Sequence, residues 1–344
     1  MEALQLVAPR EMEVRTMPDP PDPGPWEVAV RIRAVGVCGS DMHFYLEDGC
    51  AGTPAAYPQV LGHEPAGEVV AVGPGVDDLK VGDRVAIEPA ISCSRCEYCR
   101  AGRRNLCEYI QFMGGIQLPG LLREYAVVPR ENALKVPDAM SFVDAAAIEP
   151  VAVLLHARNL AQLQLGETVA VMGAGPIGLL ALQVAKLAGA SKVVIGDKVP
   201  HRLQRARELG ADQVVDVSKD SIVDAARDMT GGHGVHVVFD AAGKAASINA
   251  AIQSIRPAGR IVIIGIPSQA ETGVELWPAL QAEASIIVQK RNNGNDHAAL
   301  ELIESGQIDP ASILSNRYRL ADGGKAFAAM GEYADGVIKP VIEL

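Results

Sequence analysis

Two short segments near the start of the chain combine residue types that bind zinc and move protons. Segment 35–43 contains Cys38, Ser40 and His43, and the pair His63-Glu64 follows it. Thiolate, imidazole and carboxylate are zinc ligands, and a catalytic zinc site uses three protein ligands and leaves a fourth position open. We therefore predict a catalytic zinc ion on Cys38, His63 and Glu64. Ser40 and His43 stand beside the thiolate in the sequence and can accept and pass on a proton.

Each of these residues, taken alone, is more typical of a structural role. An isolated cysteine commonly packs as a small core residue, and an isolated histidine is commonly a satisfied buried side chain. Ser40 alone could be a turn residue and His43 a surface residue. The catalytic interpretation therefore depends on the two further motifs in the same chain.

Four cysteines fall within fifteen consecutive residues, in the pattern Cys93-x2-Cys96-x2-Cys99-x7-Cys107. Four thiolates on a short loop can close a tetrahedral shell around zinc with no open position, so we predict a structural zinc ion here. Disulfides are the alternative, but this spacing in a cytoplasmic enzyme favours metal binding. Cys50 has no partner in this count, and we expect it to be a bystander.

The second motif is a G-x-G-x-x-G sequence that follows an apolar strand and opens a helix. Gly173 permits the tight turn, Gly175 lets the backbone approach a pyrophosphate at the helix N-terminus, and Gly178 lets helix and strand pack closely. We predict a dinucleotide site that also includes Pro176 and Ile177. The alternative is an ordinary strand-to-helix turn without a ligand.

An acidic residue, Asp197, ends the next predicted strand. Its carboxylate can bind both ribose hydroxyls and repel a 2′-phosphate, which favours NAD over NADP. Lys198 and Arg202 follow closely, and either could meet a phosphate, so NADP stays open. We also assign Arg202 and, after the fifth strand, Ile266 to the cofactor site.

The order of the predicted elements indicates two domains in an α/β protein. Short strands separated by Gly and Pro, such as 28–35, 68–73 and 81–87, suggest a small barrel-like β domain. From about residue 141, strands alternate with helices. This alternation predicts a doubly wound parallel sheet with strands at 168–172, 192–197, 213–217, 235–240, 260–265 and 285–289. We place the catalytic domain at 1–151 and 293–344, with its cysteine lobe at about 90–110, and the dinucleotide domain at 152–292.

The composition is that of an ordinary globular protein, with 49% hydrophobic and 21% charged residues in a chain of 344. No apolar run is long enough for a membrane span, and no basic segment precedes the apolar residues at the N-terminus, so we expect a cytoplasmic protein. A formal net charge of −11 argues against nucleic acid or an anionic membrane as a partner.

In combination, these motifs resemble the zinc-dependent medium-chain dehydrogenases. The resemblance covers essentially the whole chain and is carried by segment 36–43, the triplet 62–64, the four-cysteine lobe and the glycine motif. It implies a GroES-like β-barrel catalytic domain beside a Rossmann coenzyme domain. It also implies two zinc ions per subunit and NAD as the cofactor.

Within that family, segment 147–150 is informative because it carries Glu149 where alcohol dehydrogenases commonly have a cysteine ligand. A glutamate here resembles the sorbitol and other polyol dehydrogenases, and also the butanediol dehydrogenases. The resemblance implies Cys38, His63 and Glu64 as ligands, with Glu149 touching the metal-bound water. One thiolate and one carboxylate already neutralise Zn²⁺, and a second carboxylate would oppose formation of an alkoxide. We therefore expect Glu149 to stand outside the ligand shell or to exchange with Glu64 during turnover.

The implied reaction is oxidation of a secondary alcohol of a sorbitol-, xylitol- or iditol-like polyol, with zinc as Lewis acid and hydride transfer to NAD. Ser40 would take the proton and His43 would relay it towards solvent. Phe112 and Arg291 are expected to contact the polyol, although Arg291 could be a solvated loop residue. Phe44 and Asn292 replace tyrosines of the animal sorbitol enzymes, which leaves the identity of the polyol open.

Two other interpretations remain. A butanediol dehydrogenase, or a dehydrogenase of a sugar or sugar acid, would keep the same metal and nucleotide residues. A structural or sensory relative would have kept the fold and lost catalysis. The resemblance also suggests a homo-oligomer, a dimer or tetramer, formed through the edge strand at 285–289, and it leaves the physiological direction of the reaction open.

Overall fold

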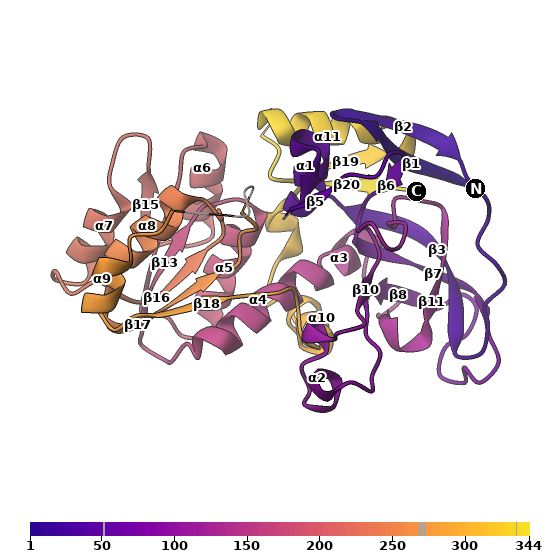
Figure 1. The fold of residues 1–344 in the computed structure, drawn as a ribbon, viewed down its shortest axis with the longest axis horizontal. Helices are drawn as coiled ribbons and strands as arrows, with labels where there is room; N and C mark the ends of the chain where they lie inside the picture. The colour runs from indigo at the N-terminus through magenta and orange to yellow at the C-terminus, as the bar shows by residue number, and fades with distance from the viewer. Residues whose placement is uncertain (51, 268–270, 272, 335) are drawn as a thin grey trace. The chain divides into compact units, whose positions relative to one another are not determined.

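The computed structural model of the protein describes residues 1–50, 52–267, 271, 273–334 and 336–344. These residues form two compact units (Figure 1). Unit 1 comprises residues 1–152 and 292–344, and unit 2 comprises residues 153–291. Helix α4 (Ile148–Ala161) begins in unit 1 and ends in unit 2.

Unit 1 is built around a seven-stranded sheet in which the long strand β3 is central. The order is β12-β8-β7-β3-β20-β19, and β11 also pairs with β3. The bounds are β3 (Glu27–Gly36), β7 (Glu64–Val72), β8 (Arg84–Ile87), β11 (Tyr125–Pro129), β12 (Ala133–Lys135), β19 (Leu314–Arg319) and β20 (Lys339–Glu343). Alternating buried residues of β3, including Val28, Val30 and Ile32, enter the core of the unit.

One predicted strand of unit 1 is shorter than expected. We predicted a strand over 81–87, but β8 begins only at Arg84. The reason is a turn closed by Asp83, whose Oδ2 accepts a hydrogen bond of 3.0 Å from the backbone N–H of Lys80. A side chain that bonds a nearby amide in this way competes with the strand ladder.

Smaller elements complete unit 1. Strands β1 (Glu2–Ala8), β2 (Glu11–Thr16) and β6 (Gln59–Val60) form a three-stranded sheet, and β4 (Gly49–Cys50) pairs with β5 (Thr53–Pro54). Strand β9 (Ala90–Ile91) pairs with β10 (Gln111–Phe112). The helices are α1 (Gly39–Glu47), α2 (Glu97–Arg100), α3 (Phe142–Ala146), α10 (Asp296–Glu304) and α11 (Gly323–Glu332).

Unit 2 is a six-stranded, fully parallel sheet in the order β15-β14-β13-β16-β17-β18, which confirms the predicted doubly wound architecture. The bounds are β13 (Thr168–Met172), β14 (Lys192–Asp197), β15 (Gln213–Asp216), β16 (Val235–Asp240), β17 (Ile255–Ile263) and β18 (Ser285–Val288). Strand β17 begins at Ile255, earlier than predicted, and its register against β16 shifts between Val235 and Val237.

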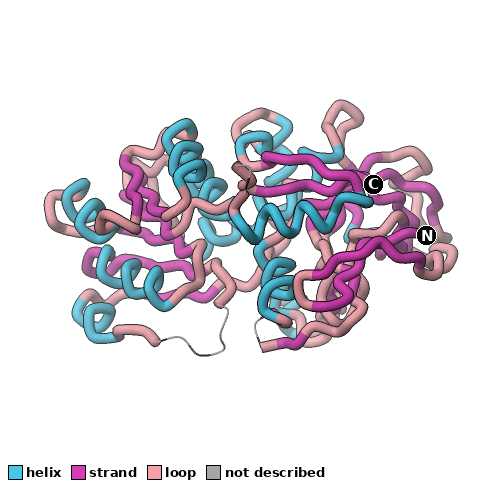
Figure 2. Tube along the Cα trace, turned by 90° about the horizontal axis from the view of Figure 1, so that it is seen from above, coloured by secondary structure: helices cyan, strands magenta, loops and turns pink. Residues whose placement is uncertain are grey.

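Helices flank the strands of this sheet (Figures 1 and 2). Helices α5 (Pro176–Leu187) and α6 (Pro200–Glu208) pack against each other, and so do α7 (Ile222–Met229), α8 (Ala245–Ser254) and α9 (Leu276–Gln281) in succession. Among the described residues, no helix is both long and apolar enough to cross a bilayer.

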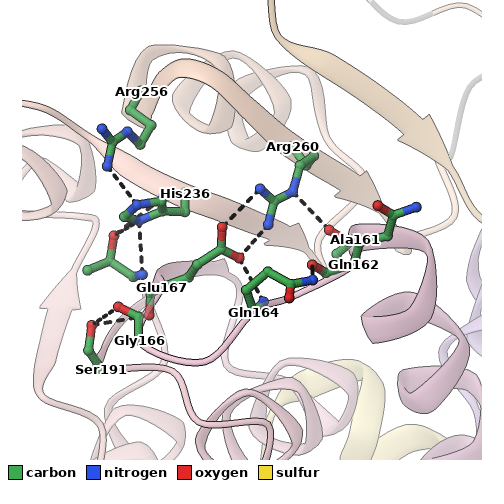
Figure 3. A network of polar contacts seen from close by, with 10 residues as sticks. Ala161, Gln162, Gln164, Gly166, Glu167, Ser191, His236, Arg256 and Arg260 are labelled. Atoms are coloured by element: carbon green, nitrogen blue, oxygen red, sulfur yellow. Dashed lines mark hydrogen bonds and ion pairs between the residues drawn. The ribbon is translucent and has the colours of Figure 1, made fainter.

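A partly buried ion pair holds the loop before β13 in place (Figure 3). The guanidinium of Arg260 makes a two-pronged contact with the carboxylate of Glu167, and its Nε donates to the carbonyl of Ala161 at 2.8 Å. Burial would raise the pKa of Glu167, but the hydrogen bonds from Arg260 and the amide of Gln164 hold it below its usual value. The network therefore ties the end of α4 to the start of the sheet.

Candidate active site

The register of the central sheet of unit 1 brings the three predicted catalytic ligands together. Gly36, the last residue of β3, pairs with Glu64, the first residue of β7. Cys38 lies two residues after the end of β3 and is the N-cap of α1. As a result, the ligand atoms of Cys38, His63 and Glu64 all lie within 4.8 Å of one another.

The environment of Glu64 shows that this cluster fits a metal ion. Glu64 is fully buried, and its Oε1 has no hydrogen-bond partner among the described residues. A buried carboxylate oxygen without a partner is costly, and coordination to a cation would satisfy it. Sulfur, imidazole nitrogen and carboxylate oxygen are also the donors that zinc prefers.

Asp41, which belongs to none of the predicted ligand or relay residues, holds this ligand set in place. Its Oδ2 accepts from the backbone N–H of Cys38 at 3.0 Å, and its Oδ1 accepts from that of Gly62 at 3.1 Å. Oδ1 also lies 3.2 Å from Nδ1 of His63. A carboxylate on one ring nitrogen of a histidine orients the other nitrogen towards a metal.

The titration behaviour of this pair agrees with the geometry. Burial alone would raise the pKa of Asp41, but His63 and the two amides hold it below its usual value. Burial alone would lower the pKa of His63, but the charges of Asp41 and Cys38 hold it well above its usual value. A sequence signal for Asp41 existed, because an acid at the third position of a helix commonly bonds back to the N-cap.

The predicted proton-relay residues lie on helix α1. Ser40 Oγ is 3.1 Å from His63 Nε2, so the hydroxyl lies against the ligand cluster. His43 Nδ1 is 2.8 Å from Glu47 Oε2, one helical turn further on. No hydrogen bond joins Ser40 to His43 among the described residues. The structure therefore places Ser40 at the ligand cluster and His43 in a contact with Glu47 on the partly exposed side of α1.

A buried lysine, Lys339, is a second residue that the sequence analysis missed. It is 2% exposed, its ammonium forms an ion pair with Glu64 Oε2, and it donates to the carbonyl of Val37 at 3.1 Å. Burial lowers the pKa of Lys339, but attraction to Glu64 and Cys38 outweighs burial and leaves it raised. No local pattern indicates Lys339, because only the pairing of β20 with β3 brings it to Glu64.

Glu149, at the start of α4, is coupled electrostatically to the same cluster. Burial, followed by the charge of Glu64, raises the pKa of Glu149 to about 8. A carboxyl group with this pKa is mostly neutral at pH 7. Glu149 does not belong to the group of residues whose ligand atoms lie within 4.8 Å of one another, which consists of Cys38, His63 and Glu64.

The predicted substrate residues lie in different environments. The ring of Phe112 is 5.2 Å from that of His63, so it belongs to the cluster in unit 1. Arg291 is the last residue of unit 2 and has a left-handed backbone with φ of 55°. Asn292 is buried, and its Nδ2 donates to Glu88 and, at 2.8 Å, to Asp296. Both hydrogens of that amide are therefore used within unit 1.

The four lobe cysteines converge as predicted for a closed metal site. Their sulfurs lie within 4.8 Å of one another, and none forms a disulfide. Backbone N–H groups donate to these sulfurs, from Cys93 to Cys107 and from Cys96 to Cys93, both at 3.3 Å. Hydrogen bonds from the amides of Cys99 and Glu108 lower the pKa of Cys96 to about 6, which favours its thiolate. Cys50 lies outside both clusters.

In unit 2, glycine occupies each of the three motif positions for a different physical reason. Gly173 has φ of 95°, which only glycine adopts without strain. A Cβ on Gly178 would lie 1.8 Å from the carbonyl oxygen of Gly173, so close packing excludes a side chain. Gly175 has neither constraint, since its φ is −68° and a Cβ there would approach Arg202 at an ordinary 3.6 Å. A glycine that neither its backbone nor its neighbours require leaves the backbone open to close approach by a pyrophosphate.

Asp197 borders this loop at the end of β14. Its Oδ2 accepts from the N–H of Ala174 at 2.7 Å, and its Oδ1 accepts from those of Lys198 and Val199 at 2.7 and 2.9 Å. These bonds fix an anionic group beside the glycine turn. Of the other predicted cofactor residues, Pro176 and Ile177 begin α5, Arg202 is buried on α6, and Ile266 is 38% exposed after β17.

Replacing Asp41 by asparagine tests the role assigned to it. Asp41→Asn removes the charge that orients His63, so we expect about 10–100-fold weaker zinc binding at the cluster of Cys38, His63 and Glu64. Competition with a chelator, followed by metal analysis, measures this. Asp83→Asn is a matched control, because Asp83 is also a buried, turn-forming aspartate of unit 1. Equal zinc affinity in Asp41→Asn and wild type would contradict the assignment.

Comparisons with known proteins agree with this arrangement. Residues 24–138 match the family model of the alcohol dehydrogenase GroES-like domain, and residues 176–305 match that of the zinc-binding dehydrogenases. Sorbitol dehydrogenase of Bacillus subtilis is 34% identical over 342 residues, 99% of this chain and 97% of the relative.

Two solved structures extend the comparison. A zinc-binding dehydrogenase of Sinorhizobium meliloti solved with NADP has a TM-score of 0.90 at 33% identity, covering 100% of this chain and 99% of the other. The 2R,3R-butanediol dehydrogenase of Bacillus subtilis has a TM-score of 0.88 at 31% identity, with the same coverage. The chain belongs to the zinc-dependent medium-chain dehydrogenase family.

Proposed function

We propose that this protein oxidises a secondary alcohol of a sorbitol-like polyol to the ketose, with zinc and NAD as cofactors. The observation that carries the proposal is the ligand set of Cys38, His63 and Glu64, with Glu149 coupled to it. The similarity to a sorbitol dehydrogenase along nearly the whole chain supports the polyol class. A butanediol dehydrogenase of similar fold supports the alternative substrate class.

Each cofactor would have a defined role in this reaction. Cys38, His63 and Glu64 would hold a zinc ion that, when bound, makes an alcohol more acidic, while NAD held at the glycine loop accepts hydride. The four lobe cysteines would hold a second, structural zinc ion. The reaction therefore needs both units of the chain.

The protein residues would bind the substrate and move its proton. Ser40 Oγ, which lies at the ligand cluster, would accept the alcohol proton. His43 would pass this proton towards solvent, with Glu47 fixing its ring through Nδ1. Phe112 would line the apolar side of the substrate site, and Arg291 would bind a polyol hydroxyl.

NAD is the proposed cofactor, with NADP as the alternative. The fixed carboxylate of Asp197 beside the glycine turn supports NAD, because it would repel a 2′-phosphate. Lys198 and Arg202, which follow Asp197 closely in the sequence, and the NADP in the Sinorhizobium structure support NADP. We further propose a cytoplasmic location.

A panel of alcohols tests the proposed function. We expect the highest kcat/KM for sorbitol, xylitol or iditol with NAD, lower values for 2,3-butanediol and for aldoses, and lower values with NADP. Removal of the zinc ion from the open site should abolish activity, and added zinc should restore it. A preference for butanediol would favour the alternative enzyme. Equal turnover before and after zinc removal, or none with any alcohol, would reject zinc-dependent dehydrogenation.

We also propose that the protein is a homodimer or homotetramer that pairs through unit 2. Strand β18 is the end strand of its sheet, and Val288 on it is 75% exposed. Next to it in sequence, α9 exposes Leu276, Trp277 and Leu280 by 64–70%. An unpaired strand edge beside exposed apolar residues is a typical site of association between copies.

A charge on this edge tests the oligomer. Val288→Asp should convert the oligomer to monomers, because a buried unpaired carboxylate opposes pairing. Light scattering coupled to size-exclusion chromatography measures the mass. Val81→Asp is the control, since Val81 in unit 1 is also exposed, at 62%. A monomeric wild type, or an unchanged mass in Val288→Asp, would contradict the proposal.

A further inference from the structure

The pairing of Lys339 with Glu64 bears directly on the predicted zinc site. Lys339 is the first residue of β20, and its side chain is 2% exposed. Its ammonium contacts one oxygen of Glu64 and the carbonyl of Val37, the residue before Cys38. The same ammonium therefore touches one predicted zinc ligand and the backbone next to another.

The fold reserves space for this contact. Gly36 pairs with Glu64 on one side and with Val341 on the other, so β3, β7 and β20 meet at this residue. A Cβ on Gly36 would lie 2.3 Å from Glu64 Oε2 and 3.1 Å from Lys339 Cε. Only glycine at this position leaves room for the ion pair. The pair is thus part of the packing of the sheet and not a chance contact of long surface side chains.

Both oxygens of Glu64 are buried without a hydrogen-bond partner among the described residues, and Oε2 forms an ion pair with the ammonium of Lys339. A zinc ion at the cluster would compete with the ammonium for the charge of one carboxylate. A cation beside the carboxylate weakens its attraction for a second cation, and the ammonium also repels the zinc ion directly.

We propose that Lys339 is a positioning residue that shares the Glu64 carboxylate with the catalytic zinc ion and so makes Glu64 a weakly held ligand. Oε1 would be the oxygen available to the metal while Oε2 stays on the ammonium. A weakly held ligand can leave and return as the metal exchanges its other ligands, without loss of Cys38 or His63. This inference rests on the zinc site of the proposed function and adds to it a role for Lys339 in weakening the bond between Glu64 and zinc.

Two effects of Lys339 on the metal have opposite signs, which makes the inference testable. If charge sharing dominates, loss of the ammonium should strengthen zinc binding, because Glu64 then gives its whole charge to the metal. If Lys339 serves only to anchor Val37, its loss should loosen Cys38 and weaken zinc binding. The sign of the change therefore separates charge sharing from a purely structural role.

The experiment measures the rate at which a chelator removes zinc from the open site. Lys339→Met removes the charge, and Lys339→Gln removes the charge but keeps a donor for Val37, which guards against misfolding of the methionine variant. We expect zinc loss to slow by about tenfold in both, as for loss of one competing charge-assisted hydrogen bond. The zinc ion of the four-cysteine lobe is an internal control and should be lost at an unchanged rate.

A double-mutant cycle shows whether Lys339 acts through Glu64. In the Glu64→Gln background, Lys339→Gln should change the logarithm of the rate of zinc loss by less than half of the change that it causes in the wild-type background. Faster zinc loss from Lys339→Gln, or an equal effect in both backgrounds, would overturn the inference and leave the proposed function intact. Absence of zinc from the open site of the wild-type protein would overturn both.

Discussion

The site depends on one constraint, which is that the sulfur of Cys38, a ring nitrogen of His63 and a carboxylate oxygen of Glu64 lie close together near the end of β3. Cys38 lies two residues after β3, His63 lies directly before β7, and Glu64 is the first residue of β7. The pairing of β3 with β7 therefore brings the three close together. Asp41 then locks the two segments together by accepting from the amides of Cys38 and Gly62. The backbone geometry of the two segments therefore sets most of the metal site, and the carboxylate of Asp41 holds the segments together.

Burial of several charges in one place follows from this arrangement. Six ionisable side chains of unit 1 interact electrostatically: Cys38, Asp41, His63, Glu64, Glu149 and Lys339. Unpaired buried charges are costly, so such a cluster is stable only if its signs balance and its hydrogen bonds are satisfied. Lys339 supplies a cation that the charge count made from the sequence had omitted. It balances the charge of Asp41, and Glu149, whose pKa is raised to about 8, adds little negative charge at pH 7.

Residues with a local signal were predictable, and residues defined by distant packing were not. The glycine motif was readable because strand, turn and helix are consecutive in sequence, and the parallel sheet of unit 2 follows the predicted order of strands. Lys339 could not be found in this way, because only the pairing of β20 with β3 brings it to Glu64. The same limit applies to Asn292, whose amide is engaged by Glu88 and Asp296.

The central claim is that each chain holds two zinc ions of different kinds, one closed by four cysteines and one open to substrate. The most direct measurement is the zinc content per chain of the purified protein and of its Cys38→Ser variant. We expect two ions per chain in the wild type and one in the variant, with the remaining ion on the lobe. A single ion in the wild type that Cys38→Ser leaves in place would contradict it.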